Sequence, residues 1–261
     1  MELPVDPMDS GSMEKQMALQ QELMAAISHE IRTPVSRLSF ALQILQDALK
    51  EDAQGEGRKK MLASCKSMGQ DLEEINQLVA EIMTYIHLGD GGPRIVFQRL
   101  YLKSAMQSLC SQYSTLHPQL SIDIRRPLLE LSIDAEPVQL RRACQNLIGN
   151  AIKYAKSRII VDYSLDGDYC LLSVEDDGPG ISEADYGRVF APFTRLDESR
   201  HRSTGGFGLG LSIVRRIAFW HGGRAIAGRS KELGGAKMII KLPVKQPTGS
   251  LPELSMAHPV D

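Results

Sequence analysis

The residues that could do chemistry in this sequence fall into two groups that lie far apart in the chain. The first is the segment His29–Pro34, which contains a histidine, a glutamate and a threonine ahead of a proline. The second, between Asn146 and Leu211, combines asparagines, acidic residues and glycine-rich turns. Histidine is a nucleophile that can form covalent intermediates, and glycine-rich turns ahead of a helix bind phosphates through backbone N–H groups. Together the two groups predict a phosphoryl acceptor and a phosphoryl donor site in one chain.

His29 is predicted to face solvent. It lies midway between Ile27 and Ile31, which we place on the buried side of a helix. Two residues along a helix correspond to a rotation of about 200°, and Thr33, four residues further on, shares the face of His29. An imidazole that titrates near physiological pH is a competent nucleophile, and a neighbouring carboxylate, here Glu30, can orient it and accept its proton.

Pro34 favours a functional role for His29. Proline lacks an N–H group, so it leaves the carbonyl of Glu30 unpaired and bends the helix just after the histidine. A proline inside a helix costs about 3 kcal/mol, which suggests that something other than stability retains it. The chain has six histidines, and His29 alone could be solvated and idle, but Pro34 and Thr33 weaken that alternative. The other five histidines are interpreted as structural.

The predicted helix Pro137–Lys156 carries the first part of a nucleotide site. Asn146 and Asn150 are four residues apart and share a face, and Lys153 and Tyr154 follow in the next turn. Neutral amide oxygens suit a Mg²⁺ ion whose charge is mostly balanced by phosphates, and a lysine can contact a phosphate oxygen. Two asparagines alone would also fit an ordinary polar helix face.

Two glycine-rich segments supply the rest of the predicted site. Asp176 ends a predicted strand and precedes Gly178 and Gly180; a carboxylate there can accept from an exocyclic amino group and so select adenine, while the glycines let a base approach the backbone. The run Gly205–Leu211 precedes an apolar helix and can bind phosphates, although it is neither a Walker A loop nor a Rossmann fingerprint. A D-x-G-x-G segment alone is also ordinary turn chemistry. The order and spacing of the elements together favour a nucleotide site.

Composition limits the class of protein. The chain has 261 residues, with 43% hydrophobic and 24% charged residues, which is typical of a soluble globular protein of one or two domains. A net charge of −2 provides no global attraction to nucleic acid or anionic lipid. The four cysteines form no C-x-x-C pair, which argues against a metal or disulfide scaffold. No apolar run reaches the roughly 18 residues of a membrane helix, and no signal peptide is recognisable.

Residues 14–88 are predicted to form a helical hairpin. Apolar residues recur at gaps of three and four on both sides of the polar turn Gln54–Arg58, which is typical of bundle helices. Two such helices cannot bury both sides of their apolar seam, so we expect a homodimer with a four-helix bundle. The seam consists of Ile31, Val35, Leu38, Leu42, Leu45 and Leu49 on the first helix and Cys65, Met68, Leu72, Ile75, Val79, Ile82 and Ile86 on the second.

The remaining boundaries follow from changes in composition and periodicity. Residues 1–13 are predicted to be a disordered leader and 245–261 a disordered tail, because both are rich in polar residues and proline. Residues 89–95 contain Gly89–Pro93 and are predicted to be a hinge linker. Residues 96–244 are predicted to form a mixed α/β domain with helices at 100–117, 137–156 and 209–221 and strands at 120–125, 158–165, 169–174, 224–228 and 236–242.

With these motifs in this order, the chain resembles the cytoplasmic catalytic portion of bacterial two-component sensor histidine kinases, most of all the RstB-type sensors through Phe193–Asp197 and Ser203–Gly206. The resemblance covers about residues 15–243. It implies two domains, a dimeric four-helix bundle and an α/β sandwich ATP-binding domain of the histidine kinase/gyrase/Hsp90 type. It also implies ATP-dependent autophosphorylation of His29, phosphotransfer to an aspartate of an OmpR-like response regulator, and regulator phosphatase activity.

The resemblance assigns roles residue by residue. It makes His29 the phosphoacceptor, Glu30 its acid/base partner and Thr33 the residue that orients water for dephosphorylating the regulator. Asn150 becomes the Mg²⁺ ligand, and the loop that includes Arg195 and Arg200 becomes a lid over ATP. The expected ATP-binding residues are Asn146, Asn150, Lys153, Tyr154, Asp176, Gly178, Gly180, Ile181, Phe193, Arg195, Gly206, Gly208, Leu209, Gly210 and Leu211.

Two alternatives stay open at this point. The first is an ATPase of the gyrase/Hsp90 type, but those enzymes carry a glutamate four residues before the Mg²⁺-binding asparagine, and this chain has Asn146 there. The second is a dimeric scaffold that binds nucleotide without catalysis. Full-length family members usually have membrane helices, a periplasmic sensor and a HAMP domain ahead of the acceptor histidine. We therefore expect this sequence to be the cytoplasmic part of an inner-membrane sensor.

Overall fold

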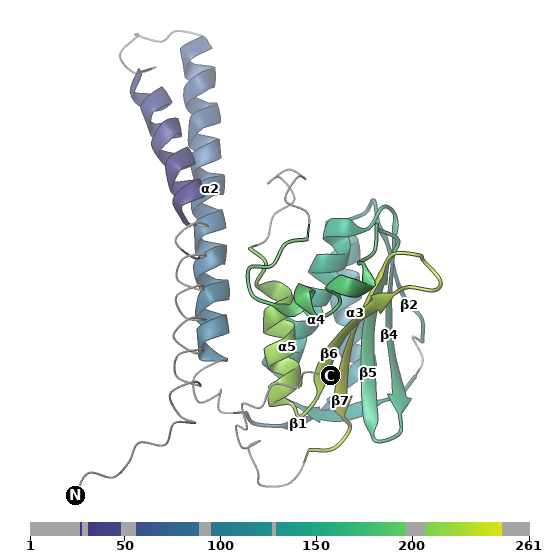
Figure 1. The fold of residues 1–261 in the computed structure, drawn as a ribbon. Coiled ribbons are helices and arrows are strands. Elements are labelled where there is room, and N and C mark those ends of the chain that lie inside the picture. Colours follow the sequence, from purple (N-terminus) through teal and green to yellow (C-terminus); the bar gives the residue numbers. More distant parts are fainter. Residues whose placement is uncertain are drawn as a thin grey trace, which may run out of the picture. The chain divides into compact units, whose positions relative to one another are not determined.

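The structure is a computed structural model that describes residues 27, 31–47, 56–88, 95–126, 129–196 and 207–246. The chain divides into two units, Met1–Met83 and Thr84–Asp261, which Figure 1 draws as a helical hairpin and a mixed α/β domain. The predicted helical hairpin and α/β sandwich are therefore both confirmed. No helix within the described ranges is long and apolar enough to cross a membrane.

An ion-pair cluster joins the helices of the first unit, which are the helical residues 31–47 and α2 (Glu56–His87). Nε of Arg37 lies 2.6 Å from Oδ1 of Asp71, and the same guanidinium donates to Glu74. Asp71 is buried, so its charge requires a partner. Because removal of one partner would leave a buried charge unpaired, this pair fixes the register of the two helices.

The predicted apolar seam is only partly buried within one chain. Leu78 is fully buried, but Leu72 and Val79 on α2, and Val35 and Leu42 on the first helix, are exposed. Within the first unit, the α2 residues that are buried in one chain each precede a predicted seam residue by one position. The reason is that the hairpin covers only one side of the apolar stripe. This agrees with the expectation that two helices alone cannot bury both sides of the seam.

The second unit is built on a five-stranded sheet of order β2-β4-β5-β7-β6. β2 pairs parallel with β4, and all other neighbours are antiparallel. Helices pack on one face of the sheet, and no helix of the described residues covers the other face (Figure 1). The elements are α3 (Leu102–Leu116), β2 (Ser121–Ile124), α4 (Pro137–Tyr154), β4 (Arg158–Asp166), β5 (Tyr169–Asp176), α5 (Gly210–Trp220), β6 (Arg224–Arg229) and β7 (Ala236–Pro243).

The core lies between the helices and the sheet. β7 shows the alternation expected of a strand that covers helices on one side: Ala236, Met238, Ile240 and Leu242 are buried, and the residues between them are half-buried. α5 contributes Ile213, Val214 and Ile217 to the same core. Each such fully buried aliphatic side chain stabilises the fold by about 1.5–3 kcal/mol.

Sequence periodicity missed one small sheet. β1 (Gln98–Tyr101) pairs antiparallel with β3 (Ser132–Ala135). The helix predicted from Leu100 therefore begins only at Leu102, and its first residues are strand instead. Four-residue strands carry too little alternation to be distinguished from a helix start, and their pairing depends on a distant segment.

The last turn of α2 belongs to the second unit, where it is capped by α5. The carbonyl of Tyr85 accepts a hydrogen bond from Arg216, whose guanidinium lies 3.5 Å from the centroid of the Tyr85 ring. Nε1–H of Trp220 donates to the carbonyl of Leu88 at 2.7 Å. The last carbonyls of a helix have no partner within the helix, so these side chains satisfy them. The predicted hinge at 89–95 follows directly and stays a prediction.

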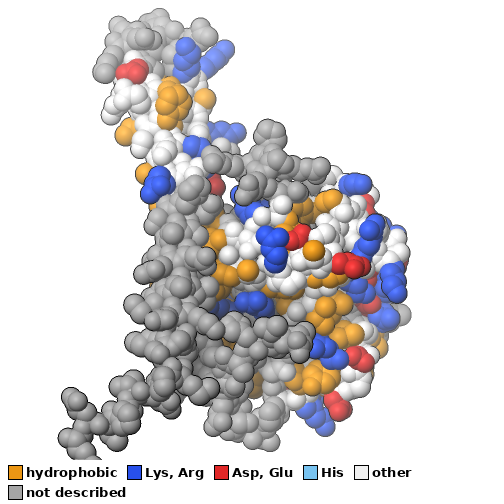
Figure 2. Space-filling view, in the orientation of Figure 1, with side chains coloured by type: hydrophobic (Ala, Val, Ile, Leu, Met, Phe, Trp, Pro, Cys, Tyr) orange, Lys and Arg blue, Asp and Glu red, His pale blue; other side chains and the backbone are white. Residues whose placement is uncertain are grey.

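Charges are mixed on the surface. Figure 2 shows Lys and Arg side chains interspersed with Asp and Glu on the visible face of the α/β domain. This agrees with the net charge of −2.

Candidate phosphoacceptor and nucleotide sites

The acceptor segment is only partly described. His29 and Glu30 lie outside the described residues, whereas Thr33 is half-buried and Pro34 is buried in the helical residues 31–47. Ser36 Oγ donates back to the carbonyl of Arg32 at 2.8 Å within this helix. The roles assigned to His29, Glu30 and Thr33 therefore stay predictions.

Helix α4 begins with a well-formed N-cap. The carboxylate of Glu136 accepts from the N–H groups of Val138 at 3.2 Å and Gln139 at 2.6 Å, and Pro137 occupies the first helical position as predicted. The backbone N–H of Glu136 donates to Nε2 of His221 at 3.0 Å. These contacts fix where α4 starts and therefore where its polar face lies.

His221 links the start of α4 to the end of α5. Its Nε2 accepts from Glu136, so Nδ1 carries the proton and donates to the carbonyl of Ile217 at 2.8 Å. The ring is fully buried, and burial lowers the pKa of His221 below its usual value. His221 is thus a structural histidine, as the sequence suggested.

The polar face of α4 meets the start of α5. A Cβ atom on Gly210 would lie 3.4 Å from Oδ1 of Asn146, so the glycine allows the two helices to approach. Nδ2 of Asn146 is buried and has no hydrogen-bond partner among the described residues. Asn150 is half-buried one turn further along the same face, and Nζ of Lys153 lies 5.2 Å from the centroid of the Tyr154 ring. Neutral amide oxygens on one helix face fit a Mg²⁺ ion that is also bound by phosphates.

Asp176 provides the most specific geometry of the site. It ends β5 and is only 2% exposed. Its Oδ1 accepts from the N–H groups of Gly178 at 2.9 Å and Ala236 at 3.2 Å, while no described residue donates to Oδ2. Burial raises the pKa of Asp176, and the two backbone hydrogen bonds offset this rise only in part. The side chain thus offers one fixed oxygen and one acceptor oxygen for a ligand donor.

Gly178 and Gly180 lie in tight contacts around Asp176. A Cβ atom on Gly178 would lie 2.5 Å from the carbonyl oxygen of Tyr154, which brings the end of α4 against the loop after β5. Gly180 has a φ of 79° and packs beside Gly235. Ile181 follows and is half-buried. The structure therefore brings the α4 residues and the Asp176 segment together, as predicted.

Asp177 was not identified from the sequence. Its carboxylate accepts from the N–H groups of Lys156 at 2.7 Å and Ser157 at 3.0 Å, and from Ser157 Oγ at 2.6 Å. Burial raises the pKa of Asp177, but these hydrogen bonds outweigh burial and lower the pKa to about 2. One carboxylate thus ties the loop after α4 to the loop after β5. An aspartate directly after a strand and before glycine was a usable signal, because such residues commonly bond nearby backbone groups.

Phe193 and Gly208 lie on either side of the predicted lid in the sequence. Phe193 has a φ of 58°, which is uncommon for a residue other than glycine. Its N–H donates to the carbonyl of Gly208 at 3.0 Å, and a Cβ atom on Gly208 would lie 2.8 Å from the Phe193 carbonyl carbon. Leu209 is buried, Arg195 and Leu211 are half-buried, and Gly206 and Arg200 lie outside the described residues.

Comparison with known proteins agrees with this geometry. Residues 19–91 match the His Kinase A (phospho-acceptor) domain, and residues 135–246 match the family of histidine kinase-, DNA gyrase B- and HSP90-like ATPases. Sensor protein RstB of Escherichia coli (strain K12) is 30% identical over 228 residues, which are 87% of this chain and 50% of RstB. The chain thus spans about half the length of the curated relatives it matches.

Solved structures with the same fold include two histidine kinases. AdeS of Acinetobacter baumannii has a TM-score of 0.63 and 22% identity, covering 83% of this chain and 98% of AdeS. The histidine kinase ThkA, in complex with response regulator protein TrrA, has a TM-score of 0.70 and 19% identity, covering 88% of this chain and 64% of that one. These likenesses concern the fold. With both domains matched in order and a sensor kinase at 30% identity, the chain belongs to the sensor histidine kinases of two-component systems.

Proposed function

We propose that this chain phosphorylates its own His29 with ATP and passes the phosphoryl group to an aspartate of a response regulator. The observation that carries the proposal is the buried carboxylate of Asp176, which has Oδ1 fixed by two backbone N–H groups and Oδ2 left for a ligand. An acceptor in that position recognises the exocyclic amino group of adenine and disfavours the carbonyl of guanine.

Other residues near Asp176 are proposed to bind the remaining parts of the nucleotide. Gly178 lets the loop after β5 pack against the Tyr154 carbonyl, which keeps Asp176 in place for the base. Lys153, in the last turn of α4, would contact phosphate oxygens. The N-terminus of α5, after Gly208, offers backbone N–H groups to phosphates. Asn150, with Asn146, would hold Mg²⁺, which when bound neutralises phosphate charge.

The reaction at His29 is an in-line displacement. A ring nitrogen of His29 forms a bond to the γ-phosphorus while the bond between that phosphorus and the β–γ bridging oxygen breaks, so ADP leaves. Glu30 accepts the proton that the imidazole releases. In the second step an aspartate oxygen of the regulator displaces the histidine nitrogen. Thr33 orients water for hydrolysis of the phosphorylated regulator.

We further propose that two copies form a four-helix bundle. Val35, Leu42, Leu72 and Val79 are exposed in the single chain, although their spacing is that of an apolar seam. Burying such a stripe against a second hairpin removes it from water at about 25 cal/mol per Å². The homodimer is therefore the simplest assembly that completes this core.

The partner is proposed to be an OmpR-like receiver domain. ThkA was solved in complex with a response regulator, and that structure shares the fold of this chain. RstB, a relative of this chain, is named a sensor protein. We also propose that this chain works on the cytoplasmic side of an inner membrane.

Phosphotransfer to receiver domains tests the partner and the role of Thr33. The chain is labelled with γ-labelled ATP, separated from nucleotide and mixed with a set of OmpR-like receiver domains. We expect rapid transfer to one receiver and slow transfer to the others. A Thr33→Ala variant should label normally but dephosphorylate that receiver poorly; an unchanged dephosphorylation rate would contradict the role of Thr33, and transfer to no receiver would contradict the partner class.

A further inference from the structure

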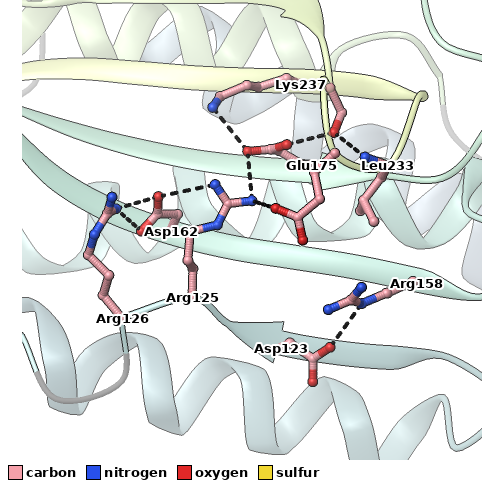
Figure 3. A network of polar contacts seen from close by, with 10 residues as sticks. Asp123, Arg125, Arg126, Arg158, Asp162, Glu175, Leu233 and Lys237 are labelled. Atoms are coloured by element: carbon pink, nitrogen blue, oxygen red, sulfur yellow. Dashed lines mark hydrogen bonds and ion pairs between the residues drawn. The ribbon is translucent and has the colours of Figure 1, made fainter.

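A network of charged and polar side chains lies on the face of the sheet opposite the helices (Figure 3). Glu175 is at its centre. Successive residues of a strand point to opposite faces, so Glu175 points away from the nucleotide site into which its neighbour Asp176 points. Glu175 is only 2% exposed despite its charge. Because it directly precedes Asp176, its contacts can affect the position of Asp176.

Three side chains approach the carboxylate of Glu175: Oε2 accepts a hydrogen bond, whereas Oε1 has ion-pair partners but no partner with hydrogen-bond geometry among the described residues. Ser230 Oγ donates to Oε2 at 2.6 Å, Nζ of Lys237 lies 3.0 Å from Oε1, and the guanidinium of Arg125 lies 3.6 Å from Oε1. Burial would raise the pKa of Glu175, but Ser230, Lys237 and Arg125 outweigh burial, and the pKa lies below its usual value. Glu175 is therefore a fixed anion at neutral pH.

Through Ser230, Glu175 organises the turn between β6 and β7. Ser230 is 1% exposed, and its Oγ accepts from the N–H of Leu233 at 2.9 Å while donating to Glu175. The backbone of Ser230 bonds Gly235 at 2.8 Å and Gly234 at 3.0 Å. Arg125 makes a second tie, because it donates to Oε2 of Glu232 at 2.5 Å.

The turn held in this way touches Asp176. The N–H of Ala236, the residue that follows the turn, donates to Oδ1 of Asp176 at 3.2 Å. A Cβ atom on Gly235 would overlap the Asp176 backbone oxygen and carboxylate. The position of the turn therefore decides whether Asp176 keeps the rotamer that leaves Oδ2 open to a ligand.

We propose that Glu175 and Ser230 are positioning residues that set the preference of this site for adenine. They act from the opposite face of the sheet, through the turn Ser230–Gly235, on the carboxylate of Asp176. The inference rests on the proposed role of Asp176 in binding adenine. Without the turn in place, Asp176 loses the Ala236 hydrogen bond, and its carboxylate no longer favours an amino group over a carbonyl at that point of the base. Phosphate contacts are unaffected, because they lie on α4 and α5.

Equilibrium binding of ATP and GTP to the full chain tests this, with the variants Ser230→Ala and Glu175→Gln. The dissociation constant for ATP should rise about tenfold in each variant, as expected for a lost hydrogen bond to a charged group, and that for GTP should change by less than about twofold. The preference for ATP over GTP should thus fall in both. Thermal unfolding of each variant confirms that it is folded.

Asp162→Asn is the matched control. Asp162 lies in the same network and is similarly buried, at 6% exposed. It bonds Arg126 at 2.5 Å and approaches Arg125 at 3.9 Å, and no described residue of the turn contacts it. This variant should be less stable but should keep the wild-type ratio of ATP to GTP affinity. A merely structural network would make it behave like the other two variants, which would overturn the proposal.

Asp176→Asn distinguishes a failure of the positioning role from a failure of the proposed adenine contact. If Asp176→Asn loses the adenine preference while Ser230→Ala and Glu175→Gln keep it, the positioning role is wrong and the role of Asp176 stands. If Asp176→Asn keeps the preference, the proposed adenine contact is wrong, and the positioning role falls with it.

Discussion

Asp176 uses its two carboxylate oxygens differently. Oδ1 is held by two backbone N–H groups, and Oδ2 is left for a ligand. Burial keeps the pKa of Asp176 above the usual 3.8 of an aspartate, since two neutral donors do not fully replace water around a charge. The residue is therefore poised to gain from a further donor such as an amino group.

The raised pKa of Asp176 predicts how binding depends on pH. The ionised carboxylate is the better acceptor for the adenine amino group, so ATP affinity should fall as pH falls towards the raised pKa, and this loss should begin at a higher pH than for an ordinary aspartate. Titration calorimetry of ATP between pH 7 and the acid limit of the fold measures it. Asp176→Asn serves as control, because its profile should lack this component. Identical profiles for the variant and the wild type would refute the prediction.

Gly178 gives a second prediction for a single residue. Gly178→Ala places a methyl group 2.5 Å from the Tyr154 carbonyl oxygen, so the loop after β5 must move away from α4 and ATP binding should be lost. Gly187→Ala is the control, because a Cβ atom there meets nothing within 4 Å. ATP affinity of both variants is compared with the wild type. Wild-type affinity in Gly178→Ala would mean that this close approach does not shape the site.

At the scale of elements, Asp177 joins α4 to β5 and predicts an acid-sensitive contribution to stability. The pKa of Asp177 is lowered from 3.8 to about 2, so its contribution is fully present above the unfolded pKa and is lost as pH falls from about 4 to about 2. After solvent screening this is on the order of 1 kcal/mol.

Asp177→Asn should therefore lower the free energy of unfolding at pH 7, and the difference from wild type should shrink below about pH 4. Urea denaturation at several pH values measures this. Asp123→Asn removes an exposed pair with Arg158 and should cost less than about 1 kcal/mol. A difference between Asp177→Asn and wild type that does not depend on pH would contradict the assignment.

The main elements could be predicted because their signals are local. α4 begins at Pro137, the β4–β5 hairpin turns at Gly167, and α5 follows the glycine run, all as the sequence indicated. The placement of Asp176, its glycines and the asparagine pair in the fold could be predicted in the same way, and their roles in nucleotide binding stay predictions. The β1–β3 pairing and the contact of Ala236 with Asp176 could not, because each depends on the register of segments far apart in sequence.

At the scale of the whole molecule, the exposed apolar stripe predicts the assembly. Val79→Asp should convert the dimer into a monomer, because it places a charge in the core of the proposed bundle. Gln70→Asp, on an exposed polar position of the same helix, is the control and should remain dimeric. Light scattering with size exclusion measures the mass of each. A monomeric wild type, or a dimeric Val79→Asp variant, would contradict the proposed bundle.

The most direct test of the account is the site of phosphorylation. The full chain is incubated with γ-labelled ATP, and His29→Ala is compared with His87→Ala, which changes an exposed histidine of α2. We predict acid-labile label on the wild type and on His87→Ala, and none on His29→Ala. Full labelling of His29→Ala would contradict the claim that this imidazole accepts the phosphoryl group.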